Sequence, residues 1–445
     1  MAMRALIGQH DHFAALFEHQ RSKFRSASRK NRGDNCCRFH NSLPVVIFSS
    51  RLNILMLFSF VGLFYYWVPT EMLKEYPTLN TILFQSALIG LIPFAERLGF
   101  VTEQLAMHTN DTYGGLLNAT FGNASELIFC CFALRNRLYR VVQLSLLGSI
   151  LSNLLFVLGL SCFVGGLKYQ VQTFTKVSGA VSSGMLMLAS ISLVLPAALK
   201  FSGQEDDATD EIYFSRFTAI IMLIMYFAYL LFQLRTHVGE FENADHSNNH
   251  SSDDEEQLLS QASNHLDDDD NDDNDDTNVP SVDTTHTQLL SFGDSVAWLF
   301  IFTGFTSFLS DIIVGTMDEF TTKHNVSAVF VAAVVLPLFS NAAEHTASVV
   351  FAYRNKMDIC LGIAIGSSIQ IALCVIPFCV IIGWITNRDL SLFFDGFETA
   401  SLLVSVVTVC FILQGGSTNW LVGVLLLGAY SVICMGFWVH RLEIL

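Results

Sequence analysis

Long apolar runs, rather than alternating polar and apolar positions, dominate the hydrophobic pattern of the chain. Runs of about 20 residues recur between residues 45 and 439, and a run of that length can cross a lipid bilayer as one helix. The pattern predicts eleven membrane-spanning helices. They lie near residues 45–68, 79–100, 112–134, 141–166, 177–199, 213–235, 292–318, 325–352, 359–385, 391–413 and 417–439.

Two of these runs carry a polar motif inside the predicted membrane segment. Residues 122–134 read GNASELIFCCFAL, and residues 340–353 read SNAAEHTASVVFAY. Both contain Asn-Ala-x-Glu, which makes the runs 112–134 and 325–352 the least hydrophobic of the set. A charged side chain at the bilayer centre costs roughly 2.5–3.5 kcal/mol on the insertion scale. We therefore expect both glutamates to face each other, a cavity or a cation rather than lipid.

An internal repeat connects the two motifs. A shift of 218 residues aligns Glu126 with Glu344. The same shift aligns, without a gap, Asn123 with Asn341, Gly148 with Gly366, Ser149 with Ser367 and Gly165 with Gly383. After the first span of the chain, each half has five predicted spans. Because five is an odd number, the second half enters the membrane from the opposite face. The predicted fold class is therefore an all-α polytopic membrane protein with one N-terminal helix and two inverted five-helix repeats, an architecture typical of secondary transporters.

The composition supports a membrane protein. Of the 445 residues, 52% are hydrophobic and 14% are charged, whereas soluble domains average about 25% charged residues. The mean hydropathy is +0.46. We predict a protein embedded in the lipid bilayer that is not an enzyme and does not bind nucleic acid.

The formal charge of −16 comes from one segment. Residues 240–286 contain 16 Asp or Glu and no Lys or Arg, centred on DDDDNDDNDD (267–276), so the remaining residues sum to zero. Such a run repels itself and predicts a disordered or loosely helical linker. It is a solvated spacer by default; alternatively it collects Ca²⁺ weakly near the cytosolic mouth, or it acts as a Ca²⁺-responsive brake. It has no EF-hand pattern, which argues against a tight site.

The distribution of basic residues predicts the orientation. The first 51 residues contain nine Lys or Arg and three acids, and such an excess before a first span keeps that end in the cytosol. Six spans later the acidic linker is then also cytosolic, although RNRLYR (135–140) falls on the opposite side. The predicted domains are a basic cytosolic region (1–44), a first helix (45–68), a first repeat (79–235), the acidic linker (236–290) and a second repeat (291–440).

The cysteines show no pattern typical of a metal finger. The chain has ten of them and no CxxC spacing. Seven lie in apolar runs, where Cys usually packs as a small hydrophobic residue: Cys130, Cys131, Cys162, Cys374, Cys379, Cys410 and Cys434.

Spacing brings polar side chains onto common helix faces. Asn123 and Glu126 are three residues apart, as are Asn341 and Glu344, so we expect each pair to share one face. In the following spans, Ser149, Ser152 and Asn153 form one such set, and Ser367 and Gln370 form the other. Two inverted copies would bring these faces together near the midplane of the membrane. Helix interruption is expected beside both motifs, because Pro337 precedes the second and glycines precede the first.

The predicted site contains only oxygen ligands. Two carboxylates with amide and hydroxyl oxygens suit a hard divalent cation, and a flexible ring of six to eight oxygens suits Ca²⁺ rather than Mg²⁺. Mn²⁺ accepts similar ligands and is an alternative. His345 adjoins Glu344, and we interpret it as a packed or proton-sharing histidine rather than as a ligand. We expect no cofactor, with Ca²⁺ as a transported substrate.

Charge balance suggests how such a site works. When Ca²⁺ leaves, two bare carboxylates remain in a medium of low dielectric constant, where desolvation and mutual repulsion favour protonation. Ca²⁺ and H⁺ therefore compete for the same groups, and alternate exposure of the site gives antiport. The alternatives are structural glutamates held in helix contacts, a Ca²⁺-permeable channel with a two-glutamate gate, and a Na⁺-coupled calcium exchanger.

Four stretches resemble a known family. GGLLNATFGNASELI (114–128) and LLGSILSNLLFVLG (146–159) resemble the first signature repeat of the cation/proton exchanger family. LPLFSNAAEHTASV (336–349) and GIAIGSSIQIALCVIPF (362–378) resemble the second. These are the vacuolar Ca²⁺/H⁺ exchangers of fungi and plants, within the calcium/cation antiporter superfamily. The resemblance covers residues 80–440.

The resemblance implies a function and a set of site residues. It implies antiport of Ca²⁺ into the vacuole, driven by protons flowing out, across a multi-pass vacuolar membrane protein. Glu126 and Glu344 correspond to the central ion ligands. The residues that correspond to the rest of the site are Asn123, Asn341, Ser149, Ser367 and Gln370, with Asn153 beside them although its shifted partner is Ile371.

Overall fold

The computed structural model describes residues 42–47, 50–68, 76–109, 114, 117, 121–201, 208–236 and 289–440. By its internal contacts the chain divides into a unit of residues 1–51 and a unit of residues 52–445. The second unit contains nearly all the elements described below. Most of the predicted basic region and the whole acidic segment 240–286 lie outside the described residues, so both remain predictions.

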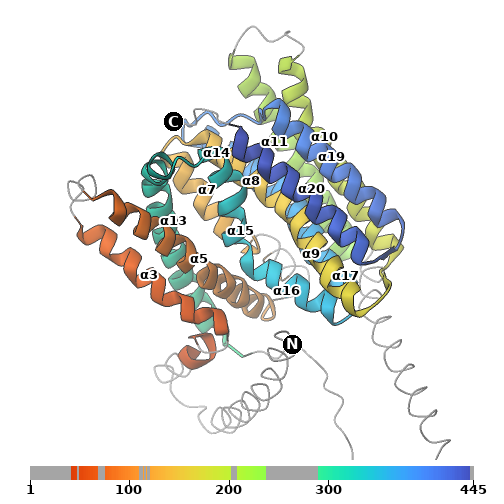
Figure 1. The fold of residues 1–445 in the computed structure, drawn as a ribbon, viewed down its shortest axis with the longest axis horizontal. Helices are drawn as coiled ribbons and strands as arrows, with labels where there is room; N and C mark the ends of the chain where they lie inside the picture. Colours follow the sequence, from red (N-terminus) through yellow and green to blue (C-terminus); the bar gives the residue numbers. More distant parts are fainter. Residues whose placement is uncertain are drawn as a thin grey trace, which may run out of the picture. The chain divides into compact units, whose positions relative to one another are not determined.

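The first half of the chain is helical (Figure 1). Its elements are η1 (Arg51–Leu55), α3 (Met56–Leu63), η2 (Phe64–Trp67), α5 (Pro77–Ala106), α7 (Ala124–Arg135), α8 (Tyr139–Leu151), η3 (Ser152–Val157), α9 (Leu158–Lys168), α10 (Lys176–Phe201), α11 (Ala208–Leu231) and η4 (Phe232–Thr236). A short strand, β1 (Gln172–Thr173), lies between α9 and α10.

The second half of the chain is also helical. Its elements are α13 (Phe292–His324), α14 (Ala328–Phe330), η5 (Val331–Val335), α15 (Leu336–Ser340), α16 (Ala342–Tyr353), α17 (Met357–Gln370), η6 (Ile371–Val375), α18 (Ile376–Ile385), α19 (Gly396–Gln414), β2 (Ser417–Thr418) and α20 (Trp420–Val439). The strands β1 and β2 pair antiparallel, with Gln172 opposite Thr418.

Most of the predicted spans are confirmed. Among the described residues, eight helices are long and apolar enough to cross a membrane, and the count is nine if α14–α15 and α16, which meet at a bend of 59°, form one broken span. The predicted first span corresponds to a shorter apolar helix, Leu52–Gly62. Within the predicted span 112–134, the second half forms the continuous helix α7. The residues before α7 are only partly described. The protein is therefore a polytopic helical membrane protein, and the count of eleven stays a prediction.

Local structure recurs at the interval found in the sequence. The bounds of α16 are those of α7 shifted by 218 residues. The left-handed residues that follow them, Arg137 and Asn355, are related by the same shift. η3 and η6 are π-helical turns, and each interrupts the helix that follows a repeat motif. π-helical turns are frequent at functional sites, so the recurrence marks these positions as more than packing.

Helices from the two halves pack against each other. α5 lies along α13, and Figure 1 shows the pair side by side. Phe84 stacks on Phe320 with ring centroids 4.4 Å apart, and Phe94 stacks on Phe305 at 4.9 Å. α9 packs on both α16 and α20, and α10 packs on α19. The core is thus made between the halves rather than within each of them.

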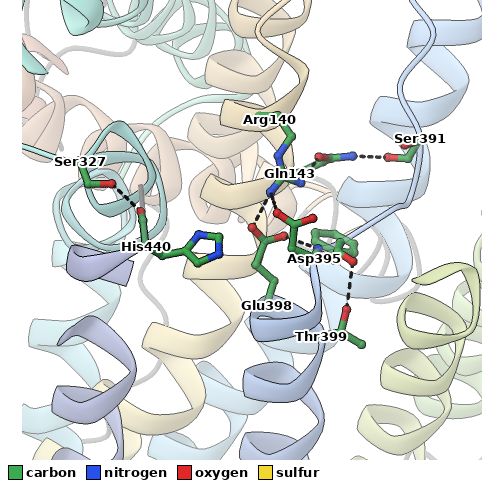
Figure 2. A network of polar contacts seen from close by, with 9 residues as sticks. Arg140, Gln143, Ser327, Ser391, Asp395, Glu398, Thr399 and His440 are labelled. Carbon is green, nitrogen blue, oxygen red and sulfur yellow. Dashed lines mark hydrogen bonds and ion pairs between the residues drawn. The ribbon is translucent and has the colours of Figure 1, made fainter. Parts of the chain in front are cut away.

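A polar network joins the start of α8 to the start of α19 (Figure 2). Arg140 Nη2 donates to Asp395 Oδ2 at 3.0 Å and to Glu398 Oε1 at 2.5 Å. Gln143 accepts from Arg140 at 2.7 Å and donates to the carbonyl oxygen of Ser391 at 2.8 Å. Glu398 is fully buried and also accepts from the backbone N–H of Asp395. Glu398 is therefore held in an ion pair with Arg140.

Arg140→Ala is expected to destabilise the protein by about 2 kcal/mol, because it leaves the buried Glu398 carboxylate without its charged donor. Thermal unfolding of the purified protein in detergent measures the effect. The matched control is Arg216→Ala, which breaks an ion pair with the exposed Asp389 and should cost no more than about 1 kcal/mol. Equal losses in the two variants would contradict this account.

Candidate cation site

Two helices begin inside the membrane segments, one in each half. α7 begins after Asn123 and α16 begins after Asn341, and both asparagines have non-helical backbone angles (φ −106° and −95°). The chain bends by 59° between α15 and α16. Glu126 and Glu344 each lie in the first turn of the new helix. The unpaired N–H groups of a first turn favour negative charge, so the breaks stabilise carboxylates at these depths.

The interruptions correct one detail of the sequence interpretation. Asn123 and Glu126 were expected to share a face of one continuous helix, as were Asn341 and Glu344. Both asparagines instead lie in the turn before the helix and act as its N-terminal boundary. The expected helix interruption beside each motif is confirmed at these residues.

Asn123 is the centre of a hydrogen-bonded chain between the two halves. Its Nδ2 donates to Gln370 Oε1 at 2.8 Å, and its Oδ1 accepts from Ser367 Oγ at 3.0 Å. Ser367 Oγ in turn accepts from Asn153 Nδ2 at 3.1 Å. The structure therefore brings together four of the predicted site residues, from the turn before α7, from η3 and from α17. Asn153 belongs to this chain although it has no polar partner at the 218-residue shift.

The two carboxylates lie close enough for their charges to repel each other. Glu126 is 5% exposed, and its Oε2 accepts from Ser125 Oγ at 2.8 Å. Glu344 also lies beside the Ser367 hydroxyl. None of the ion pairs formed by the described residues includes either glutamate. The local negative charge is thus not neutralised by a basic side chain.

Several buried oxygen atoms at this place have no hydrogen-bond partner. Among the described residues these include Glu126 Oε1, Glu344 Oε2 and Asn153 Oδ1. Most buried polar atoms in proteins are hydrogen-bonded, so unpartnered ones require an explanation. Oxygen atoms from two carboxylates and an amide are ligands that Ca²⁺ accepts. A cation held between the two halves would use the oxygens that the protein leaves unpaired.

A small cavity adjoins Glu126. Ser145, Ser149 and Ser340 line it together with the Glu126 side chain. Ser149, one of the predicted site residues, therefore lines the same cavity as Glu126. Asn341 has a neighbour in Ser340, whose Oγ donates to Asn341 Oδ1 at 3.4 Å.

Sequence reasoning missed Ser340 and Ser145. Ser340 precedes Asn341 directly, but its partner at the 218-residue shift is Gly122, so the repeat gave no sign of it. Ser145 lies one turn before Ser149 on α8, and that helical spacing could have identified it.

His345 is packed rather than directed at a cation. Its ring meets the Phe156 ring edge-on at 5.7 Å, and its Nε2 lies 3.4 Å from Ser152 Oγ. In the ranges that the structure describes, no group of three or more His, Cys, Asp or Glu is placed to hold a metal ion. A cation site here therefore depends on amide and hydroxyl oxygens as well as the two carboxylates.

Comparisons with known proteins place the chain among ion exchangers. The model of the sodium/calcium exchanger protein family matches residues 79–235 and 295–439. Vacuolar cation/proton exchanger 2 of Arabidopsis thaliana is 40% identical over 404 residues, which are 90% of this chain and 84% of that protein. The vacuolar calcium ion transporter of Schizosaccharomyces pombe is 37% identical over 398 residues, covering 89% of this chain and 86% of that one.

A solved structure has the same fold. The crystal structure of the Ca²⁺/H⁺ antiporter protein YfkE superposes with a TM-score of 0.66 at 28% sequence identity. The superposition covers 87% of this chain and 99% of that one. The likeness therefore spans both halves of the chain.

Proposed function

Because the chain belongs to the sodium/calcium exchanger protein family, we propose that it is a proton-coupled antiporter that moves Ca²⁺ out of the cytosol into the vacuole in exchange for H⁺. Relatives at about 40% identity are vacuolar cation/proton exchangers, and the solved neighbour is a Ca²⁺/H⁺ antiporter. On this proposal the protein is a multi-pass transporter of the vacuolar membrane and not an enzyme.

One observation carries the proposal: two glutamates, one from each half, have buried unpartnered oxygens and no basic partner among the described residues. A pair of structural glutamates would be hydrogen-bonded throughout. Glu126 and Glu344 are the central ligands in this proposal. Asn123, Asn341, Ser149, Ser367, Gln370 and Asn153 complete the site. Ca²⁺ is the substrate, and Mn²⁺ is a second one.

The mechanism follows from the charge of the site. Ca²⁺ neutralises both carboxylates. After Ca²⁺ leaves, the two carboxylates repel each other in a site that is shielded from water. Protons then bind the same oxygens, so the site is neutral in both loaded states. A neutral site costs less to carry through a medium of low dielectric constant than a charged one. A site loaded with Ca²⁺ or with protons can therefore switch from facing one side of the membrane to facing the other. The empty, charged site cannot make this switch. Transport of one ion therefore requires transport of the other in the opposite direction.

The proposed architecture matches this mechanism. It consists of one N-terminal helix and two five-helix repeats of opposite orientation, with the N-terminus and the acidic linker in the cytosol. The recurring bounds of α7 and α16, and the breaks at Asn123 and Asn341, support such a repeat. Inverted repeats with broken helices at the midplane provide two equivalent ways of opening one site.

Proteoliposomes with an acidic interior are expected to take up ⁴⁵Ca²⁺, and collapse of the pH gradient with an ionophore should reduce uptake to that of empty vesicles. The physical reason is that protons must leave for Ca²⁺ to enter. Uptake should be the same when Na⁺ replaces choline in the outer buffer. This comparison tests for coupling to Na⁺, which the name of the sodium/calcium exchanger protein family makes necessary. Uptake that requires a Na⁺ gradient, or that follows voltage without a pH gradient, would contradict proton antiport.

A further inference from the structure

Two of the membrane spans are tied to each other at both ends. The first clamped span, residues 139–168, consists of α8, η3 and α9, and the second clamped span, residues 357–385, consists of α17, η6 and α18. A shift of 218 residues relates their starts, so Arg140 and Asp358 are each the second residue of a span. Each of these two side chains binds the segment that follows the other span.

The first tie lies at the start of the first clamped span (Figure 2). Arg140 Nη2 donates to Asp395 Oδ2 at 3.0 Å. One turn further on, Gln143 Nε2 donates to the carbonyl oxygen of Ser391 at 2.8 Å. Both acceptors belong to the segment 386–395, which directly follows the second clamped span. The start of one span is therefore fixed to the end of the other.

The second tie lies at the start of the second clamped span. The backbone N–H of Thr175 donates to Asp358 Oδ1 at 2.7 Å. Gln172 Nε2 donates to the carbonyl oxygen of Ala352 at 2.8 Å, just before that span. Both donors belong to the segment 169–175, which directly follows the first clamped span. The two spans therefore run in opposite directions and are held together at both ends.

A repeated glycine brings each of these segments close to its own span. Gly165 and Gly383 are related by the 218-residue shift. A Cβ atom at Gly165 would overlap the Gln172 side chain, and one at Gly383 would overlap the carbonyl oxygen of Arg388. Each segment thus packs directly on the last turns of its span, and the sequence provides for this close approach in both halves.

The clamped spans carry residues of the proposed cation site at equal distances from the ties. Ser149 follows Arg140 by nine residues, and Ser367 follows Asp358 by nine, which is a rise of about 13 Å in an α-helix. Both stretches are regular α-helix, so a shift at either tie also shifts the hydroxyl. Between the spans, Asn153 Nδ2 donates to Ser367 Oγ at 3.1 Å.

We propose that Arg140 and Asp358 are positioning residues for transport, which hold the two clamped spans in the alignment that the cation site requires. This rests on the proposed function, because it concerns the same site. A shift of about 0.5 Å between the spans would stretch the 3.1 Å bond from Asn153 to Ser367 to about 3.6 Å, beyond the range of hydrogen bonds. Loss of a group that orients a metal ligand typically lowers metal affinity about 10–100-fold.

Asp358→Ala and Asp358→Asn separate the hydrogen bond from the charge. The donor to Asp358 is a backbone N–H, so the amide oxygen of Asn can replace the carboxylate oxygen, whereas Ala offers no acceptor. We expect Asp358→Ala to raise the Ca²⁺ concentration at half-maximal uptake about tenfold and to change the maximal rate by no more than about twofold. Asp358→Asn should keep both values of the natural chain.

Ser215→Ala is the matched control for loss of a hydrogen bond alone. Ser215 lies in α11 and is fully buried, and its Oγ accepts from the backbone N–H of Leu392 at 2.9 Å. This bond is of the same kind as the one to Asp358, but α11 carries no residue of the proposed site. We expect Ser215→Ala to lower the unfolding temperature as Asp358→Ala does, and to keep the natural Ca²⁺ dependence of uptake.

Binding of Ca²⁺ to the purified protein in detergent gives a second readout that needs no transport. The dissociation constant, measured by equilibrium dialysis with ⁴⁵Ca²⁺, should rise about tenfold in Asp358→Ala and in Gln143→Ala, which breaks the other tie. It should stay natural in Asp358→Asn and Ser215→Ala. Natural affinity in both Asp358→Ala and Gln143→Ala, or an equal loss in Ser215→Ala, would overturn the proposal. Failure of the proposed function is distinguishable, because a chain without proton-driven uptake still reports both ties through its Ca²⁺ binding.

Discussion

Glu126→Gln and Glu344→Gln are each expected to lower Ca²⁺ uptake by about 100-fold. Each substitution removes one negative charge from a buried site for a divalent cation. Loss of one partner of a buried charge pair costs about 3 kcal/mol, and about 1.4 kcal/mol corresponds to a factor of ten. ⁴⁵Ca²⁺ uptake under an imposed pH gradient, normalised to reconstituted protein, measures the effect.

The same two variants separate a ligand from a structural residue. Without Ca²⁺ the natural chain holds two repelling carboxylates, so Gln at either position should raise the unfolding temperature. Addition of Ca²⁺ should stabilise the natural chain and not the variants. Asp389→Asn, which changes an exposed carboxylate, is the control and should behave as the natural chain in both assays. Uptake retained in both glutamine variants would refute the proposed site.

Gly148→Ala should destabilise the protein by about 3 kcal/mol and suppress uptake. A Cβ atom at Gly148 would overlap the backbone of Ala333 in η5, and backbone cannot move aside as a flexible side chain can. Overpacking of this kind costs up to about 3 kcal/mol. If the helices separate instead, Ser149, the next residue of α8, moves away from the cavity that it shares with Glu126.

Gly366→Ala is the matched control, because Gly366 is the partner of Gly148 at the 218-residue shift. Nothing lies within 4 Å of a Cβ atom built there. Alanine in place of a helical glycine should therefore stabilise by up to about 1 kcal/mol. Opposite signs in the two variants are expected from chemical unfolding followed by circular dichroism. Similar behaviour of the two would show that α8 and η5 are not in close contact.

The sequence predicted the elements better than their contacts. Eight spans were foreseen because membrane helices must satisfy their backbone hydrogen bonds within one apolar run, and that requirement is local. Glu126 and Glu344 were foreseen because charge in such a run is costly. The exact starts of α7 and α16 were not foreseen, since backbone conformation at Asn123 and Asn341 depends on the surrounding helices.

Contacts between distant residues could not be predicted. The pairing of Arg140 with Glu398 links residues 258 positions apart, and neither the charge pattern nor the repeat relates them. Ser340 was hidden by the asymmetry of the repeat. Such details depend on how helices rotate against each other, which a hydrophobic pattern does not specify.

The hydrogen bonds of Asn123 have a consequence for biosynthesis. Its partners Ser367 and Gln370 follow it by 244 and 247 residues, so they do not exist while a ribosome is still making the first half. During that interval the translocon must hold Glu126 without the groups that later surround it. We therefore expect a nascent chain truncated before α17 to bind no Ca²⁺ and to be degraded by membrane quality control. A single half of this protein is not a weaker transporter but an unfinished one.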